Sequence, residues 1–292
     1  MSPSKSQAPK PLSRFLTALH ARPRWSWAAL LLYAVTVTLP HERVQAACSA
    51  LAVKITHQAV YRISAGLALV ELAAVTWFLA RSLAGLPRRR RVLGLWTLTF
   101  LLVALAWRVL TANNLELVHY AQYFPEGLAL TAITLSPVEA LCWVVIFGGL
   151  DEGYQYWVLS KGLSTVFDFN DIYMDLLGGA AGVVFSLAFL RIQRTRRIVA
   201  HWRAGVVTLL GICAGGLLLG AAGLMLTVED HTDRFYWFAL GRFRASSFWV
   251  QIVTNGPYKY HTLTPPEGVA LILGTVAVYA VILRKYVVSC AT

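Results

Sequence analysis

Charged residues are scarce in this chain. Only 14% of its 292 residues are Asp, Glu, Lys or Arg, whereas about 25% is usual for a soluble domain. Cysteine is also rare, and the four that occur lie far apart, so no spacing indicates a zinc site or a redox pair. The sequence also has no internal repeat. These absences exclude a disulfide framework and argue against a soluble enzyme of ordinary composition.

Apolar residues dominate instead. They make up 57% of the chain, and the mean hydropathy is +0.59. Apolar segments bounded by charged or turn residues fall at about 25–40, 63–80, 92–110, 121–135, 137–157, 171–190, 204–227 and 267–287. Most of these runs are long enough to cross the ~30 Å hydrocarbon layer of a membrane as helices. We therefore predict an all-α, polytopic integral membrane helical bundle with about eight transmembrane helices.

The net charge of +12 is distributed in a way that indicates a membrane orientation rather than nucleic-acid binding. Of the 26 basic residues, 17 lie at the N-terminus, in the loops at 81–91 and 191–203, and at the C-terminus. If eight spans are drawn, all four segments fall on one side. Basic loops mark the cytoplasmic side of a membrane and attract anionic lipid headgroups. We predict an integral membrane protein with both termini in the cytoplasm, membrane lipids as partners and no nucleic-acid partner.

This topology divides the chain into four parts. They are a cytoplasmic basic tail (1–24), three N-terminal spans with an outer interfacial helix at 41–62 (25–110), a core (111–190), and two C-terminal spans with an outer cap segment at 228–266 (191–292). Ser136-Pro137 predicts a tight turn between two antiparallel helices of the core.

Acidic residues are concentrated in that core. Eight of the 14 acids lie between Glu116 and Asp175, and the topology places most of them at outer helix ends. Helical spacing groups the polar residues on three faces: Glu116, His119 and Tyr123; Asp151 and Gln155, with Glu152 adjacent; Asp171 and Asp175. Because ionisable residues at membrane depth face a bundle interior or a water-filled cavity, we predict one outward-facing acidic cavity that contains His119.

Several of these acids have alternative explanations. Asp168 or Asn170 fits the N-cap of the helix that begins near residue 171. Glu116 and Glu126 fit a solvated position at the outer interface, and Glu71 in the second span fits a pair with an arginine such as Arg108.

A metal site is a further alternative. Glu116-x-x-His119 has the Glu-x-x-His spacing of carboxylate-bridged di-metal bundles, but those bundles need two such motifs and only one occurs here. The identity of any metal or cofactor therefore stays unknown at this point.

The order of the polar motifs resembles a known family. Glu116-x-x-His119-x-x-x-Tyr123, then Asp151-Glu152-x-x-Gln155, then Asp171-x-x-x-Asp175-x-x-Gly178 is similar to the pattern of the VanZ-like membrane proteins, which are named for a factor associated with resistance to the glycopeptide teicoplanin. The resemblance covers about residues 113–190. Asp175 stands where the family usually has Asn, and Lys161 is the basic residue nearest to the position of a usual arginine.

Two classes of function follow from the predicted cavity. The first is an intramembrane enzyme for a lipid or lipid-linked cell-envelope substrate, with His119 as general acid or base oriented by Asp151 or Glu152. The residues expected to bind substrate are Glu116, Tyr123, Gln155, Asp168, Asp171 and Asp175. Because no serine or cysteine with a recognisable nucleophile motif is present, hydrolysis would need activated water. The second class is a non-enzymatic amphiphile-binding or proton-coupled transport protein. The resemblance implies the bacterial cytoplasmic membrane as the location, and a link to glycopeptide resistance for either class.

Overall fold

The computed structural model describes residues 11–159, 167–194, 203–226, 238–240, 247–251, 259–283 and 286–289 of the chain. Its α-helices are α1 (Pro11–Ala21), α2 (Pro23–Thr38), α3 (His41–Ile55), α4 (His57–Ser82), α5 (Arg89–Val109), α6 (Val118–Thr134), α7 (Pro137–Tyr154), α8 (Phe169–Ser186), α9 (Ala204–Ala221) and α10 (Pro265–Leu283). A 3₁₀ turn, η1 (Asn114–Leu117), precedes α6, and a π turn, η2 (Gln155–Leu159), follows α7. The strands are β1 (Arg191–Arg194), β2 (Met225–Leu226), β3 (Phe238–Ala239), β4 (Val250–Gln251), β5 (Lys259–Tyr260) and β6 (Tyr286–Ser289).

Each of the eight predicted apolar segments contains a helix, so the prediction of an all-α membrane protein is confirmed at that level. Four helices, α4, α5, α9 and α10, are long and apolar enough to cross a membrane. Helices α2, α6, α7 and α8 have 16 to 18 residues and extend roughly 24–27 Å at 1.5 Å per residue. Within the described residues, the strands, which the sequence did not predict, pair as three two-stranded ribbons.

The predicted interfacial helix at 41–62 is instead two helices. The first, α3, ends at Ile55. The second, α4, begins at His57, which is six residues before the predicted start of the second span. The break lies at Thr56, which has a positive φ of 81° and accepts a hydrogen bond from Ala59 N–H on its side-chain oxygen. Such a side-chain bond satisfies one of the free N–H groups at a helix start, so Thr56 begins a new helix rather than continuing α3.

The tight turn predicted at Ser136-Pro137 is confirmed. Leu135 adopts the left-handed conformation and ends α6, and Ser136 caps α7 by accepting a hydrogen bond from Glu139 N–H at 3.4 Å. Pro137 occupies the first turn of α7, where its missing N–H costs nothing. Helices α6 and α7 are therefore neighbours joined by a short connection.

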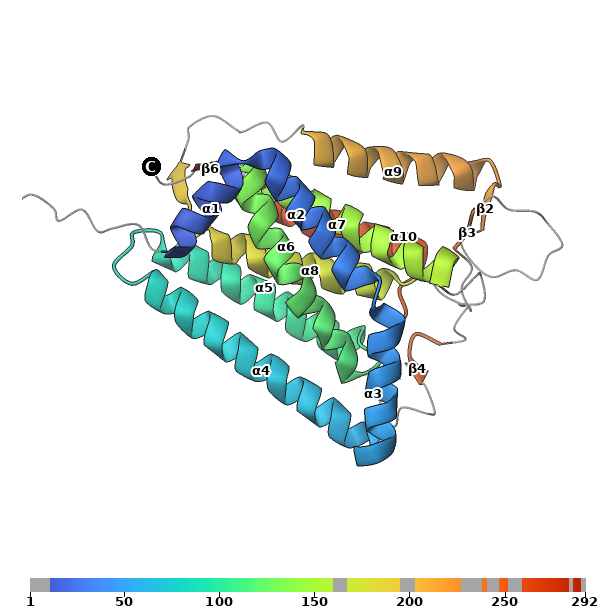
Figure 1. Cartoon of the computed structure of the whole chain (residues 1–292). Helices are drawn as coiled ribbons and strands as arrows, with labels where there is room; N and C mark the ends of the chain where they lie inside the picture. Colours follow the sequence, from blue (N-terminus) through green and yellow to red (C-terminus); the bar gives the residue numbers. More distant parts are fainter. Residues whose placement is uncertain are drawn as a thin grey trace, which may run out of the picture.

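Helix α8 lies at the centre of the bundle and packs against α5, α6, α7 and α10 (Figure 1). Its contact with α6 depends on glycine. A Cβ atom at Gly178 would lie 2.7 Å from the carbonyl oxygen of Tyr120, and one at Gly182 would lie 2.8 Å from Leu128 N. Gly178 and Gly182 are four residues apart, which is the spacing that lets membrane helices approach closely through their backbones.

Several of the basic segments lie at one end of the bundle. Arg88 donates a hydrogen bond of 2.7 Å to the carbonyl of Ala188 at the end of α8, and Ser13 of α1 contacts the carbonyl of Phe189. Strand β1 pairs antiparallel with β6 near the C-terminus. Figure 1 shows α1, β1 and β6 together at this end. Four basic segments therefore have their described parts at this end of the bundle: the N-terminal segment, 81–91, 191–203 and the C-terminal segment.

Parts of the predicted outer cap, 228–266, belong to the opposite end. His261 and Leu263 contact Asn170 at the start of α8, and the Arg108 guanidinium lies 5.9 Å from the ring centre of Trp249. The residues at 227–237, 241–246 and 252–258 lie outside the described part of the chain. Helix α10 begins at Pro265, two residues before the predicted span.

Candidate functional site

The site centres on His119, which α6 holds against α8. The Nδ1 atom of His119 lies 2.9 Å from Asp175 Oδ1, and the Nε2 atom lies 3.6 Å from Asp171 Oδ2. His119 is only 3% exposed, the Asp175 side chain is fully buried, and the Asp171 side chain is 17% exposed. The two aspartates follow each other by one helical turn, so α8 presents a carboxylate to each imidazole nitrogen. The predicted meeting of His119, Asp171 and Asp175 is confirmed.

A glycine makes room for Asp175 beneath this histidine. A Cβ atom at Gly148 of α7 would lie 2.7 Å from Asp175 Oδ2, so a larger residue would displace the carboxylate. The Oδ2 atom is buried and has no hydrogen-bond partner among the described residues. A buried polar oxygen without a partner carries a desolvation cost, so this atom is available to a proton, a water molecule or a ligand.

Asp151 and Tyr123 extend the site. The Tyr123 hydroxyl is 3.5 Å from Asp151 Oδ2, at the limit of a hydrogen bond, and Asp151 Oδ1 is buried and unpartnered in the described part of the structure. The predicted pairing of Asp151 with Gln155 is absent. Gln155 donates to Glu152 Oε1 at 3.1 Å instead, because the helix changes to the π turn η2 at residue 155 and the side chain no longer follows the i, i+4 row.

Glu152 ties the end of α7 to the start of α8. Its Oε2 atom accepts a hydrogen bond of 3.2 Å from Asp168 N–H. Asp168 itself is the N-cap of α8 and accepts from Asn170 N–H at 2.9 Å. Asp168 therefore has the capping role that was considered for it. Its backbone N–H also bonds to Glu152, which fixes the start of α8 against the end of α7. Lys161 lies outside the described residues.

Asn170 is a structural centre that spacing alone did not reveal. Its side-chain amide donates to the carbonyls of Leu110 and His261, each at 2.8 Å, and its oxygen accepts from Leu263 N–H at 2.8 Å. It thus joins α5, the start of α8 and the segment before α10. An asparagine two residues after an N-cap is the only sequence signal for it, and its three partners come from distant parts of the chain.

Glu116 has a backbone role at the entrance to α6. Its carboxylate accepts from Ala112 N–H at 2.8 Å and from the Asn113 side chain at 2.9 Å. Burial raises the pKa of Glu116 well above its usual value, and the nearby negative charge of Asp171 raises it further. Because η1 ends at Leu117, Glu116 is not one turn below His119 in the same helix. No hydrogen bond or ion pair joins the Glu116 and His119 side chains, both of which are described.

Two further acids differ from expectation. Glu126 is 2% exposed rather than solvated. It lies seven residues after His119, and Tyr123 lies between them on the same face of α6. Glu71 is exposed on α4 and has no ion pair with Arg108, whose guanidinium instead faces Trp249. The pair with Arg108 that was considered for Glu71 is therefore not formed.

The described residues contain no preassembled metal site. No group of three His, Cys, Asp or Glu side chains there has the arrangement needed to hold a metal ion. The carboxylates nearest to His119 instead contact its two nitrogens directly.

Comparisons of the chain with protein-family models, with curated proteins and with solved structures found no match. The resemblance to VanZ-like proteins therefore rests on the motifs at His119, Asp151 and Asp171 alone.

Proposed function

We propose that this chain is a VanZ-like integral membrane protein with eight spans, both termini in the cytoplasm and the His119 site facing the periplasm or cell exterior. The support is the separation of charge along the bundle. Basic segments gather at the end where β1 pairs with β6, and His119, Glu152 and Asn170 lie towards the other end. Basic residues mark the cytoplasmic end of membrane bundles.

The proposed activity is proton transfer to or from the polar part of a lipid or lipid-linked envelope substrate. The observation that carries it is the position of His119 between Asp175 and Asp171. A general base works when a second group fixes the orientation of its ring. Asp175, fully buried, fixes the imidazole through Nδ1. Asp171 is more exposed and lies beside Nε2, where it would bind a cationic or hydroxyl group of the substrate.

Neighbouring residues define how such a reaction would proceed. Carboxylates, rather than a serine or a cysteine, contact both nitrogens of His119. His119 would therefore take a proton from water or from a substrate hydroxyl, and no covalent intermediate on a protein side chain is needed. Glu152 supports the site from outside by fixing the start of α8 through Asp168.

A second candidate is amphiphile binding without catalysis, or proton-coupled transport. It is favoured by the polar groups that continue inward from His119. Tyr123 and Glu126 follow at one and two turns along α6, and Asp151 and Asp175 each have an unpartnered buried oxygen. Seven residues of α-helix cover about 10 Å, so these groups form a row suited to passing protons along the bundle interior.

Teicoplanin susceptibility tests the proposed function. The chain is expressed in a sensitive bacterium, and the minimum inhibitory concentration is compared for the wild type, His119→Ala, Asp175→Asn and His57→Ala. His57 is exposed at the start of α4 and serves as the matched control. We expect the wild type and His57→Ala to raise the inhibitory concentration, and His119→Ala and Asp175→Asn to lose that effect at equal membrane abundance. Protection that survives His119→Ala would overturn the proposal.

Native mass spectrometry of the same variants separates the two candidates. If the protein is an enzyme, His119→Ala retains a bound lipid substrate that the wild type converts. If it is a binding protein, His119→Ala and Asp171→Asn both lose the bound lipid, in proportion to the contacts removed.

A further inference from the structure

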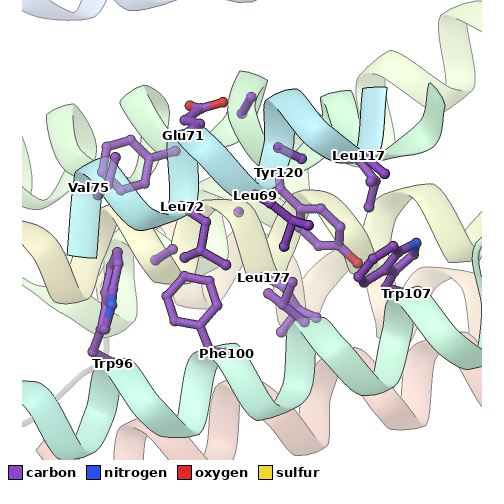
Figure 2. A pocket seen from close by; sticks show the side chains of 17 residues that line it. Leu69, Glu71, Leu72, Val75, Trp96, Phe100, Trp107, Leu117, Tyr120 and Leu177 are labelled. Carbon is purple, nitrogen blue, oxygen red and sulfur yellow. The ribbon is translucent and has the colours of Figure 1, made fainter. Parts of the chain in front are cut away.

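A groove of about 120 Å³ lies between α4 and the helices α5, α6 and α8 (Figure 2). Its walls are apolar apart from a few groups, and Leu72, Phe100 and Leu177 are typical of them. Helices α4 and α5 are two of the four that are long and apolar enough to cross a membrane. The groove is therefore at a depth where the surrounding solvent is lipid hydrocarbon rather than water.

The way α4 is attached explains why the groove exists. At one end, Asn114 of η1 donates a hydrogen bond of 3.1 Å to the Tyr61 carbonyl. At the other, Trp96 of α5 donates to the Thr76 hydroxyl at 3.0 Å, and Phe78 stacks on Phe185 at 6.0 Å. Between these attachments α4 presents the small side chains of Ala65 and Ala68. The middle of α4 therefore leaves a space that its ends do not.

Two of the polar side chains that line the groove are Glu71 of α4, which is exposed, and Tyr120 of α6. The Tyr120 hydroxyl oxygen is buried and makes no hydrogen bond to any described residue. In Figure 2 the Tyr120 ring extends between the helices towards Trp107. In hydrocarbon an unpaired hydroxyl is costly, and it is stabilised by any acceptor that reaches it. Tyr120 lies near the N-terminal end of α6, close to η1, so the acceptor would come from the end of the bundle where His119 lies.

From this arrangement we infer that the groove binds an acyl chain of a membrane phospholipid, with the Tyr120 hydroxyl donating to an ester carbonyl at the head of that chain. An apolar cavity of about 150 Å³ stays dry and accepts a benzene-sized guest, so the groove suits a stretch of hydrocarbon. The chain would run from Tyr120 and Trp107 towards Phe100 and Trp96, all of which line the groove.

This lipid site is separate from the proposed function of His119. Tyr120 follows His119 directly on α6, and successive helical residues point about 100° apart. His119 faces Asp175, whereas Tyr120 lines the groove with Gly178. The inference does not rest on the proposed activity, and His119→Ala should leave lipid binding in the groove unchanged.

Photolabelling of the full chain in phosphatidylcholine vesicles tests the inference. The probe is a phosphatidylcholine that carries a diazirine in its acyl chain, and labelled residues are mapped by mass spectrometry. We expect Leu72 and Phe100, which line the groove, to be labelled more than Leu67 and Val70, which are 66% and 69% exposed on the outside of α4. Labelling of Leu72 and Phe100 that does not exceed that of Leu67 and Val70 would overturn the inference.

Two variants sharpen the test. Ala68→Phe fills the groove from α4, and Ala73→Phe adds the same side chain at an exposed position of the same helix. Ala68→Phe should lower labelling of Phe100 at least tenfold, and Ala73→Phe should not lower it. Tyr120→Phe should reduce retention of phosphatidylcholine in native mass spectra about fivefold, as expected for the loss of one hydrogen bond. Equal labelling of Phe100 in both alanine variants would contradict the proposed site.

Discussion

Gly178→Ala should destabilise the bundle and open the His119 site without altering any polar residue. The added Cβ would lie 2.7, 2.8 and 3.1 Å from the carbonyl oxygen, Cα and carbonyl carbon of Tyr120. All three are backbone atoms, so no side-chain rotation relieves the contact. Restoring the 3.4 Å at which ordinary contact begins requires α6 and α8 to separate by about 0.7 Å.

That separation acts directly on the site. His119 precedes Tyr120 on α6, and Asp175 lies one turn before Gly178 on α8. If α6 and α8 separate by about 0.7 Å along the line that joins His119 Nδ1 to Asp175 Oδ1, that distance grows from 2.9 Å to about 3.6 Å, which is beyond a normal hydrogen bond. Overpacking costs typically about 1–3 kcal/mol, and the loss of a buried hydrogen bond adds roughly 1–3 kcal/mol. We expect a loss of about 2–6 kcal/mol in the free energy of unfolding.

Thermal unfolding in detergent measures this loss, with Gly66→Ala as the control. A Cβ at Gly66, in the exposed middle of α4, meets nothing within 4 Å. Because alanine favours helix over glycine by about 1 kcal/mol, Gly66→Ala should be as stable as the wild type or slightly more stable. If Gly178→Ala unfolds at the wild-type temperature, the backbone contact between α6 and α8 is not as close as described.

Three other predictions follow from single contacts. Asn170→Ala leaves the Leu110 and His261 carbonyls and the Leu263 N–H unpaired, and should lower the free energy of unfolding by about 2–4 kcal/mol in thermal or denaturant unfolding. Glu139→Ala removes the acceptor of Gly205 N–H at the start of α9; hydrogen exchange of α9 should rise, whereas Glu139→Gln, which keeps an acceptor oxygen, should largely prevent the rise. The pKa of Glu116 is higher in the folded protein than in the unfolded chain, so folding retains its proton and stability should fall as pH rises above about 4.5. Unfolding measured across pH in Glu116→Gln should show a smaller fall.

Apolar length and helix punctuation were sufficient to predict a helix in each apolar segment, but not α1, which lies within the predicted basic tail. Every predicted apolar segment contains a helix, and Ser136-Pro137 is a turn, because both features depend on neighbouring residues in the chain. The start of α4 was missed by six residues. Thr56 ends the preceding helix through an uncommon backbone conformation, and no hydrophobic pattern indicates such a conformation.

The site was predictable where it depends on helical spacing and not where it depends on contacts between distant segments. Asp171 and Asp175 share a face of α8, so their joint approach to His119 followed from an i, i+4 interval. The burial of Glu126 depends on how α6 packs in the bundle. The hydrogen bonds of Asn170 depend on segments that lie more than 50 residues away in the sequence. Gln155 bonds to Glu152 rather than to the predicted partner Asp151 because of the π turn η2, which the sequence did not indicate.

Asp175 holds His119 in a buried site between α6 and α8. Nitrogen-15 NMR of the histidine-labelled protein in lipid nanodiscs tests it most directly, with His119→Ala to assign the signal among the seven histidines. We expect the His119 ring N–H to exchange slowly with water, and Asp175→Asn to shift the His119 nitrogen resonances while those of exposed His57 stay in place. If the His119 ring N–H exchanges as fast as that of His57 and its resonances do not shift in Asp175→Asn, Asp175 does not hold His119 in a buried site.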